Sequence, residues 1–120
     1  PGTDSPGVAK FADMVGGAFD ATSPFTPESY DAAALIMLAM QAANSAEPGD
    51  YKSKVMDVAN APGELIYPGE LGKALDILAA GGEIDYVGAT AVELIGPGES
   101  AGNYRQIEVS GGKISTVKYR

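Results

Sequence analysis

The sequence predicts a mixed α/β chain in which helices come first and a β-hairpin comes last. Two observations support this prediction. Up to Gly82 the apolar residues recur at the spacing of amphipathic helices, whereas from Ile84 onward they alternate with polar residues at the period of a strand. The pattern shows neither an internal repeat nor a regular alternation of strands with helices, so we expect the two kinds of element to be segregated along the chain.

The stretch from Tyr30 to Ala43 is central to the interpretation of the chain. It is long and apolar, and it carries no charge after Asp31. A helix over this stretch is apolar around almost its whole circumference, so we expect it to be buried on most sides. At ~1.5 Å per residue it is roughly 21 Å long, which is too short for the ~30 Å hydrocarbon core of a bilayer. The sequence therefore predicts a core helix of a globular protein.

The first two helices share one start signal, a hydroxyl residue followed by proline, at Ser5-Pro6 and Thr26-Pro27. The hydroxyl can cap the first turn, and proline in the first helical position loses no hydrogen bond. The second helix contains the long uncharged stretch and is expected to end near Asn44. The first helix has a weak last turn at Gly16-Gly17, and its apolar stripe consists of Val8, Phe11, Ala12, Val15, Ala18 and Phe19.

Two further helices are expected from Asp50 to Asn60 and from Pro68 to Gly82. The first of these spans two to three turns at most, and the second ends at paired glycines. The residues between them, Glu64 to Tyr67, form too short a run next to Pro68 to count as more than an extended link. One face of the second helix is apolar and consists of Leu71, Ala74, Leu75 and Leu78.

The last third of the chain is expected to be extended, with short pieces at Ile84 to Val87 and at Ala91 to Ile95. After a turn-rich segment, Tyr104 to Val109 alternates as a strand with one buried face, and Ile114 to Tyr119 returns beside it as a β-hairpin. A two-stranded hairpin is marginal alone, and an apolar helix needs a sheet to lie on. The sequence therefore indicates that the sheet beneath the central helix belongs to chain outside these residues.

The composition excludes several classes of function. With 8 basic and 16 acidic residues the net charge is -8, so we expect no nucleic-acid partner. There is no Cys and no His, which removes thiolate metal sites and the commonest general base. We expect neither a cofactor, nor a metal site, nor an enzyme, because catalysis would have to rely on carboxylates, Lys or Tyr.

Three groups of residues are candidates for a functional site. The acids between Asp57 and Asp76 have no spacing that makes two carboxylates converge, and Glu93, Glu99 and Ser100 lack the alternating pattern of a calcium loop. Tyr30 places a hydroxyl and an aromatic ring in the first turn of the central helix, at the end that favours ligand groups. A Tyr that packs on the edge of the core explains Tyr30 equally well.

Five motifs occur in an order that resembles a known family: the N-terminal run from Pro1 to Pro6, then Tyr30-Asp31-Ala32-Ala33, Val58-Ala59-Asn60-Ala61-Pro62-Gly63, Ile84-Asp85-Tyr86-Val87-Gly88-Ala89, and Gly102-Asn103-Tyr104 with Ile107-Glu108-Val109. Together they resemble the C-terminal third of periplasmic solute-binding proteins of the branched-chain amino acid ABC transporter family, which have the type I periplasmic binding fold. The segment from Ile95 to Glu99 departs from the aromatic-Asp turn that is usual there.

The resemblance implies a fragment of a two-lobed α/β fold with solute held in the cleft between the lobes. Residues 1–90 would form the helical part of the first lobe, and residues 91–120 the last hinge crossing and the C-terminal β-hairpin of the second lobe. Tyr30 would face the cleft as a ligand-binding residue, with Glu28 and Ser29 as weaker neighbours. The implied protein catalyses nothing and is periplasmic or extracytoplasmic.

The implied partners are a small-molecule solute, such as an amino acid or amide, an ABC transporter permease, and the rest of a longer parent chain. A ligand-sensing regulatory or receptor domain of the same fold is the alternative. We also expect possible self-association of the 120-residue chain through the apolar surface of Leu35 to Met40.

Overall fold

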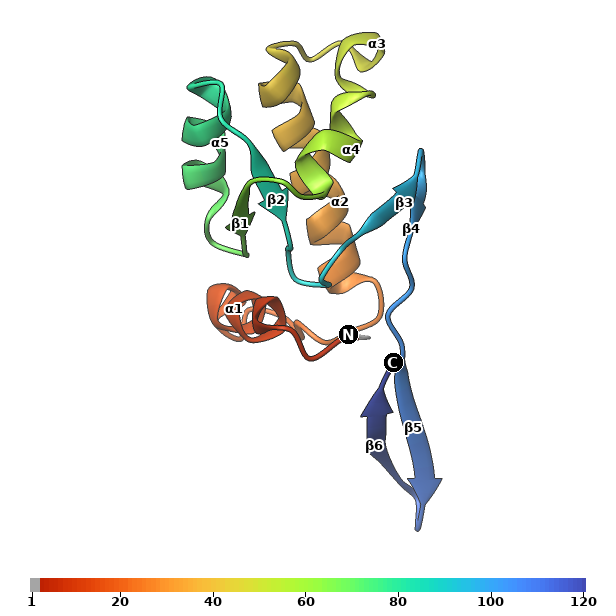
Figure 1. The fold of residues 1–120 in the computed structure, drawn as a ribbon. Coiled ribbons are helices and arrows are strands. Elements are labelled where there is room, and N and C mark those ends of the chain that lie inside the picture. The colour runs from red at the N-terminus through yellow and green to blue at the C-terminus, as the bar shows by residue number, and fades with distance from the viewer. Residues whose placement is uncertain (1–2) are drawn as a thin grey trace.

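A computed structural model describes residues 3–120; Pro1 and Gly2, which begin the first of the five motifs, lie outside the described residues. The predicted mixed α/β class is confirmed (Figure 1). None of the described helices is long and apolar enough to cross a membrane. The elements in chain order are α1 (Pro6–Val15), α2 (Thr26–Ala43), α3 (Pro48–Tyr51), α4 (Lys54–Ala59), β1 (Glu64–Ile66), α5 (Leu71–Ala79), β2 (Ile84–Tyr86), β3 (Leu94–Gly96), β4 (Glu99–Ser100), β5 (Arg105–Ser110) and β6 (Lys113–Tyr119).

Helix α1 begins where the sequence predicts and ends earlier. Ser5 occupies the N-cap position, although its hydroxyl makes no capping bond. Gly16 adopts a left-handed conformation at φ 57° and donates its N–H to the carbonyl of Ala12, which ends the helix. The prediction that the stripe continues to Phe19 is therefore wrong. Phe19 instead folds back, and its ring centroid lies 6.5 Å from that of Phe11.

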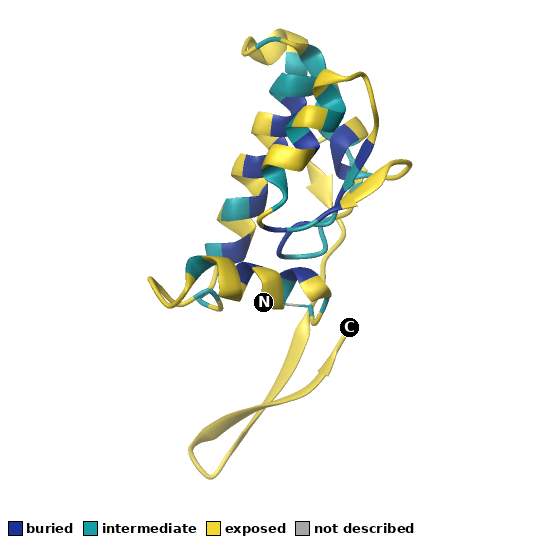
Figure 2. Cartoon of the chain, turned by 90° about the vertical axis from the view of Figure 1, so that its left-hand side faces the viewer, coloured by how far each residue is buried: buried dark blue, intermediate teal, exposed yellow. Residues whose placement is uncertain are grey.

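Helix α2 runs from Thr26 to Ala43, close to the predicted limits, but Phe25 and not Thr26 takes the N-cap position. The expectation that α2 is buried on most sides is wrong. Ile36 and Met37 on its outer face are 42% and 50% exposed. Exposed segments recur along α2 in Figure 2. The opposite face is buried, and it consists of Asp31, Ala34, Leu35, Leu38 and Ala39.

Strands β1 and β2 pair in parallel and are joined by α5, so the chain contains a βαβ unit. The prediction of a mere link at Glu64 to Tyr67, without alternation of strands and helices, is wrong here. Three-residue strands are too short to show a periodicity, and only the crossover helix brings them into register. The strands beneath α2 are also partly in this chain, because Ile66 and Tyr86 share one core with Leu38. The expectation that all strands beneath α2 lie outside these 120 residues is therefore corrected.

The hydrophobic core lies between this small sheet and helices α2, α4 and α5. Leu65 points to the opposite face of the sheet, where its side chain is 50% exposed. The predicted helix from Asp50 to Asn60 is divided into α3 and α4, and the predicted helix after Pro68 is confirmed as α5. The buried core residues are Ala34, Leu35, Leu38, Ala39, Val58, Ala59, Ile66, Ala74, Ile84 and Tyr86.

The C-terminal hairpin is confirmed as β5 and β6, which pair in antiparallel register around Gly111 and Gly112. Its predicted buried face is wrong within the described chain, since every residue of both strands is exposed. The hairpin extends away from the helices (Figure 1). The predicted strand at Ala91 to Ile95 begins later, at Leu94, because Ala91 adopts a left-handed turn conformation at φ 52°.

Candidate functional site at helix α2 and the β2–β3 loop

Asp31, in the second turn of α2, is the buried charged residue of the described chain, with a side chain only 2% exposed. It lies on the face of α2 that turns toward the sheet, among apolar neighbours. Removing a carboxylate from water is unfavourable unless hydrogen bonds replace the lost hydration. The surroundings of Asp31 must therefore supply donors.

Four donors from the end of β2 and the loop that follows it converge on the Asp31 carboxylate. The Tyr86 hydroxyl and the Ala89 N–H each donate to Oδ1 at 2.8 Å. The Thr90 N–H and the Thr90 hydroxyl donate to Oδ2 at 2.8 Å and 2.6 Å. Both carboxylate oxygens are thus satisfied, and the loop from Gly88 to Thr90 is held against α2.

Two glycines allow this close approach. Gly88 adopts φ 63°, and a Cβ there would collide with Asp31 Oδ1 and with the Tyr86 ring. On its other side, Gly7 in α1 lies so close that a Cβ would collide with the carbonyl oxygen of Gly88. The loop is therefore enclosed between α1 and α2, and neither contact tolerates a side chain.

Tyr86 gives the cluster a measurable pH dependence. Burial, and then the negative charge of Asp31, raise the pKa of Tyr86 well above its ordinary value of 10.0. Because the folded-state pKa is raised, the stabilising contribution is fully present below pH 10 and is lost as the pH rises from there toward the folded-state pKa.

We expect Tyr86→Phe to lower the free energy of unfolding at pH 7 by about 1–2 kcal/mol, because Asp31 loses one donor. We also expect the variant to lose stability less steeply above pH 10 than the wild type. Urea unfolding between pH 7 and 11 measures both effects. Tyr119→Phe in the exposed hairpin is the matched control, and equal alkaline slopes for the wild type and Tyr86→Phe would contradict the assignment.

Helix α1 lies across the carboxyl ends of β1 and β2, beside the first turn of α2 (Figure 1). The Lys10 ammonium sits 5.5 Å from the ring centroid of Tyr67, which directly follows β1, and Gly7 contacts the loop after β2. In open α/β sheets, ligands bind outside the carboxyl ends of the strands. This edge of the sheet is therefore the candidate ligand-binding region.

The structure places the three predicted ligand residues differently. Tyr30 is half-buried at this edge, where its ring packs 5.0 Å from the ring centroid of Phe11 and burial raises its pKa. Glu28 and Ser29 are exposed, and Glu28 lines a shallow hollow between α2 and the β3–β4 pair. Their ligand-binding role stays a prediction.

Sequence reasoning missed two residues at this edge. Phe25 is 78% exposed although it is a large aromatic, and it adopts φ 67°, a conformation that non-glycine residues rarely take. Backbone strain of this kind concentrates at functional sites. No spacing rule points to Phe25, whereas Asp31 had a visible signal: it is a charge at the start of an otherwise uncharged helical face.

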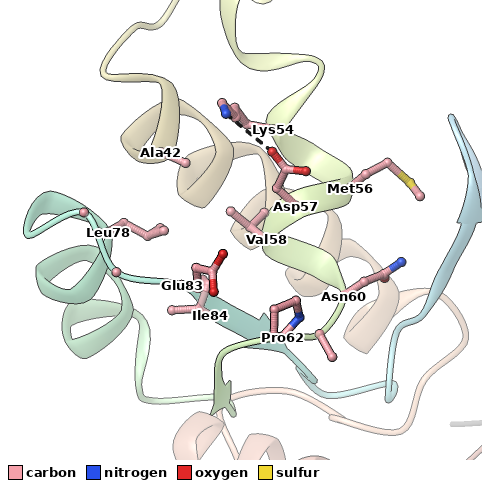
Figure 3. A pocket seen from close by; sticks show the side chains of 13 residues that line it. Ala42, Lys54, Met56, Asp57, Val58, Asn60, Pro62, Leu78, Glu83 and Ile84 are labelled. Atoms are coloured by element: carbon pink, nitrogen blue, oxygen red, sulfur yellow. Dashed lines mark hydrogen bonds and ion pairs between the residues drawn. The ribbon is translucent and has the colours of Figure 1, made fainter.

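A hollow of about 490 Å³ lies at the amino ends of β1 and β2 (Figure 3). Its polar groups include the ion pair between Lys54 and Asp57, at 3.5 Å, and the Glu83 carboxylate. Of the acids between Asp57 and Asp76, Asp57 pairs with Lys54 and Glu64 pairs with Lys73. Among the described residues there is no cluster of three or more acids that could hold a metal ion.

Comparison with known proteins finds one informative similarity. The chain is 38% identical over 73 residues to the chemotactic signal transduction system substrate-binding protein BasB of Halobacterium salinarum. The match covers 59% of this chain but only 18% of that relative, so the chain spans about a fifth of its length. No family model and no solved structure matches. The similarity supports the predicted relation to substrate-binding proteins without reaching the branched-chain amino acid family.

Proposed function

We propose that the chain is the C-terminal part of an extracytoplasmic solute-binding protein, which captures an amino acid or a related small polar solute and delivers it to an ABC importer. The observation that carries this proposal is the similarity over 73 residues to part of a substrate-binding protein. The proposed protein binds its solute and does not alter it. Recovery of a chemically changed solute after incubation would contradict that part.

The geometry of the candidate site supports the proposal, because it suits one half of a ligand cleft. Tyr30, Phe25 and the loop held by Asp31 gather at the carboxyl edge of the small sheet, and the exposed Phe25 ring offers an apolar face to a ligand side chain. The other half of the cleft would come from the remainder of the longer protein. We therefore expect the 120-residue chain alone to bind solutes weakly.

Uncovered apolar surfaces support the remainder of the longer protein as a partner. Ile36 and Met37 are exposed on α2, Leu65 is exposed on the far face of β1, and the apolar residues of the hairpin are exposed as well. Exposed apolar side chains that are neighbours on one face, as Ile36 and Met37 are on α2, are typical of an interface. The surface available for self-association is the outer face of α2, because Leu35, Leu38 and Ala39 are buried.

Calorimetric titration of the longer protein with a panel of amino acids and amides tests the proposed function. We expect one class of solute to bind with a saturating heat. Absence of binding to every small polar solute in the panel would overturn the proposal.

Phe25→Ala is expected to weaken solute binding by the longer protein by about two- to tenfold, since aromatic stacking contributes about 0.5–1.5 kcal/mol. Alanine at position 25 must still adopt the left-handed backbone conformation, so the loss of the aromatic ring is the main change. Tyr119→Ala in the hairpin is the control, because Tyr119 is also an exposed aromatic but lies away from the carboxyl edge of the sheet. Equal affinities for both variants would remove Phe25 from the site.

The second candidate is a ligand-sensing domain of the same fold that acts on a receptor. The name of the relative, a substrate-binding protein of a chemotactic signal transduction system, favours it. Deleting the parent gene discriminates the two candidates: loss of solute uptake supports the importer, whereas loss of chemotaxis with normal uptake supports the sensor.

A further inference from the structure

We propose that Asp31, Thr90 and Asn103 form a hydrogen-bond relay that sets the orientation of the β5–β6 hairpin relative to helix α2, with Asn103 as its release point. The relay is argued from this chain alone. Its meaning for a cleft that opens and closes rests on the proposed function.

The inner half of the relay has a buried acceptor, Asp31, and a partly buried donor residue, Thr90. Asp31 takes both the N–H and the hydroxyl of Thr90, at 2.8 Å and 2.6 Å, and the N–H of Ala89 at 2.8 Å. Short bonds to a charged acceptor that is shielded from water are the strong ones. The loop around Thr90 therefore moves with α2 as one body.

The outer half of the relay starts from the carbonyl groups that follow in the same loop. The Asn103 side-chain amide donates to the carbonyl oxygen of Thr90 at 3.2 Å and lies 3.4 Å from that of Ala91. Thr90 is thus held by Asp31 through its donors and by Asn103 through its acceptor. This links residues that lie 72 positions apart in sequence (103 − 31).

Asn103 directly precedes the base of the hairpin. Tyr104 and Arg120 exchange two backbone hydrogen bonds, at 2.9 Å and 2.8 Å, and so close the hairpin one residue after Asn103. A hydrogen bond that fixes the Asn103 side chain therefore also restrains the base from which β5 and β6 extend.

Apolar packing does not hold the hairpin, since all residues from 101 to 120 are exposed. The segment between loop and hairpin is anchored at its start, where the Asn60 amide exchanges two hydrogen bonds with the backbone of Leu94, at 2.7 Å and 3.0 Å. At its end, the Ala101 N–H donates to the Glu93 carbonyl at 2.8 Å. Among the residues that the structure describes, the Asn103 side chain therefore joins the base of the hairpin to the loop that Asp31 holds.

The two halves differ in strength. The bonds of Asp31 are short and shielded, whereas those of Asn103 are longer and exposed, so water competes for the Asn103 amide at little cost. We expect Asn103 to release first, and the hairpin then to swing about the segment from Glu93 to Gly102. In the proposed binding protein this swing would change the angle between the lobes.

Distance measurement between two spin labels tests the relay in the 120-residue chain. The sequence has no Cys, so Ala33→Cys on α2 and Lys113→Cys at the hairpin turn accept labels at these two sites alone. We expect a narrow distance distribution in the otherwise unchanged chain. Asn103→Ala is expected to broaden it about twofold at unchanged helical circular dichroism, because only an exposed contact is lost.

Asp31→Asn is expected to broaden the distribution in the same way. The substitution replaces one carboxylate oxygen by an NH2 group, so a donor would face the N–H and O–H donors of the loop. Asp76→Asn on the exposed face of α5 is the matched control and should leave the distribution unchanged. If Asp31→Asn does not fold, Asn103→Ala decides the question. A distribution as narrow in Asn103→Ala as in the unchanged chain overturns the relay, and so does equal broadening in Asp76→Asn. No solute takes part, so failure here is distinct from failure of the proposed function.

Discussion

Replacing Asp31 with alanine is expected to lower the free energy of unfolding by about 3–5 kcal/mol, because hydrogen bonds to a charged group contribute about 1.5–3 kcal/mol each and several are lost together. The Tyr86 hydroxyl and the amides of Ala89 and Thr90 would remain without their acceptor. Such a loss is a large share of the 5–15 kcal/mol that stabilises a typical domain. Urea unfolding followed by circular dichroism measures it.

Asp76→Ala is the matched control for this variant, since it removes a carboxylate from the exposed side of a helix. We expect a change within about 0.5 kcal/mol there. If Asp31→Ala proved equally mild, the carboxylate would not hold the loop, and the candidate site would lose its structural basis.

Leu38→Ala is expected to lower the free energy of unfolding by about 2–5 kcal/mol, the range for truncating a leucine in a packed core. The Leu38 side chain is 1% exposed and packs among residues of α4, α5 and both parallel strands. Ile36→Ala on the same helix is the control, because Ile36 is 42% exposed and its truncation leaves no closed cavity. Denaturant midpoints of the two variants give the comparison.

The Ile36 control also tests the proposal that this chain is part of a longer protein. In the 120-residue chain we expect a change of at most about 1 kcal/mol from Ile36→Ala. If other parts of the longer protein cover the outer face of α2, the same substitution should cost more there. Equal costs for Leu38→Ala and Ile36→Ala in the 120-residue chain would mean that α2 does not pack on one face as described.

Local chemistry was sufficient to predict where α1 and α2 begin and where α2 ends, but not the end of α1 or the division of the predicted helix from Asp50 to Asn60 into α3 and α4. The starts at Pro6 and near Thr26, the left-handed Asn44 that ends α2, and the hairpin turn at Gly111-Gly112 all follow from caps, prolines and glycines, whose effects act within one turn. The βαβ unit was missed because its strands are three residues long, and their pairing depends on a crossover that no local pattern encodes.

The candidate site was predictable in part. Tyr30 was identified, and it does lie at the carboxyl edge of the sheet, yet its contact with Phe11 depends on how α1 crosses that edge. Asp31 carried a signal in the sequence, a charge in an apolar run, but its partners lie 55 or more positions away. Spacing arguments cannot join residues at that separation.

The sequence by itself determined the class, the order of the helices and the final hairpin, because helix caps, prolines and hydrophobic periodicity act locally. Only the tertiary structure decided which face of Tyr30 to Ala43 is buried. An almost uncharged helix has no periodicity to choose a face, so the choice depends on where the strands and the Asp31 donors lie. The stretch thus carries one packed face, one uncovered face, and a carboxylate that holds the loop leading to the hairpin.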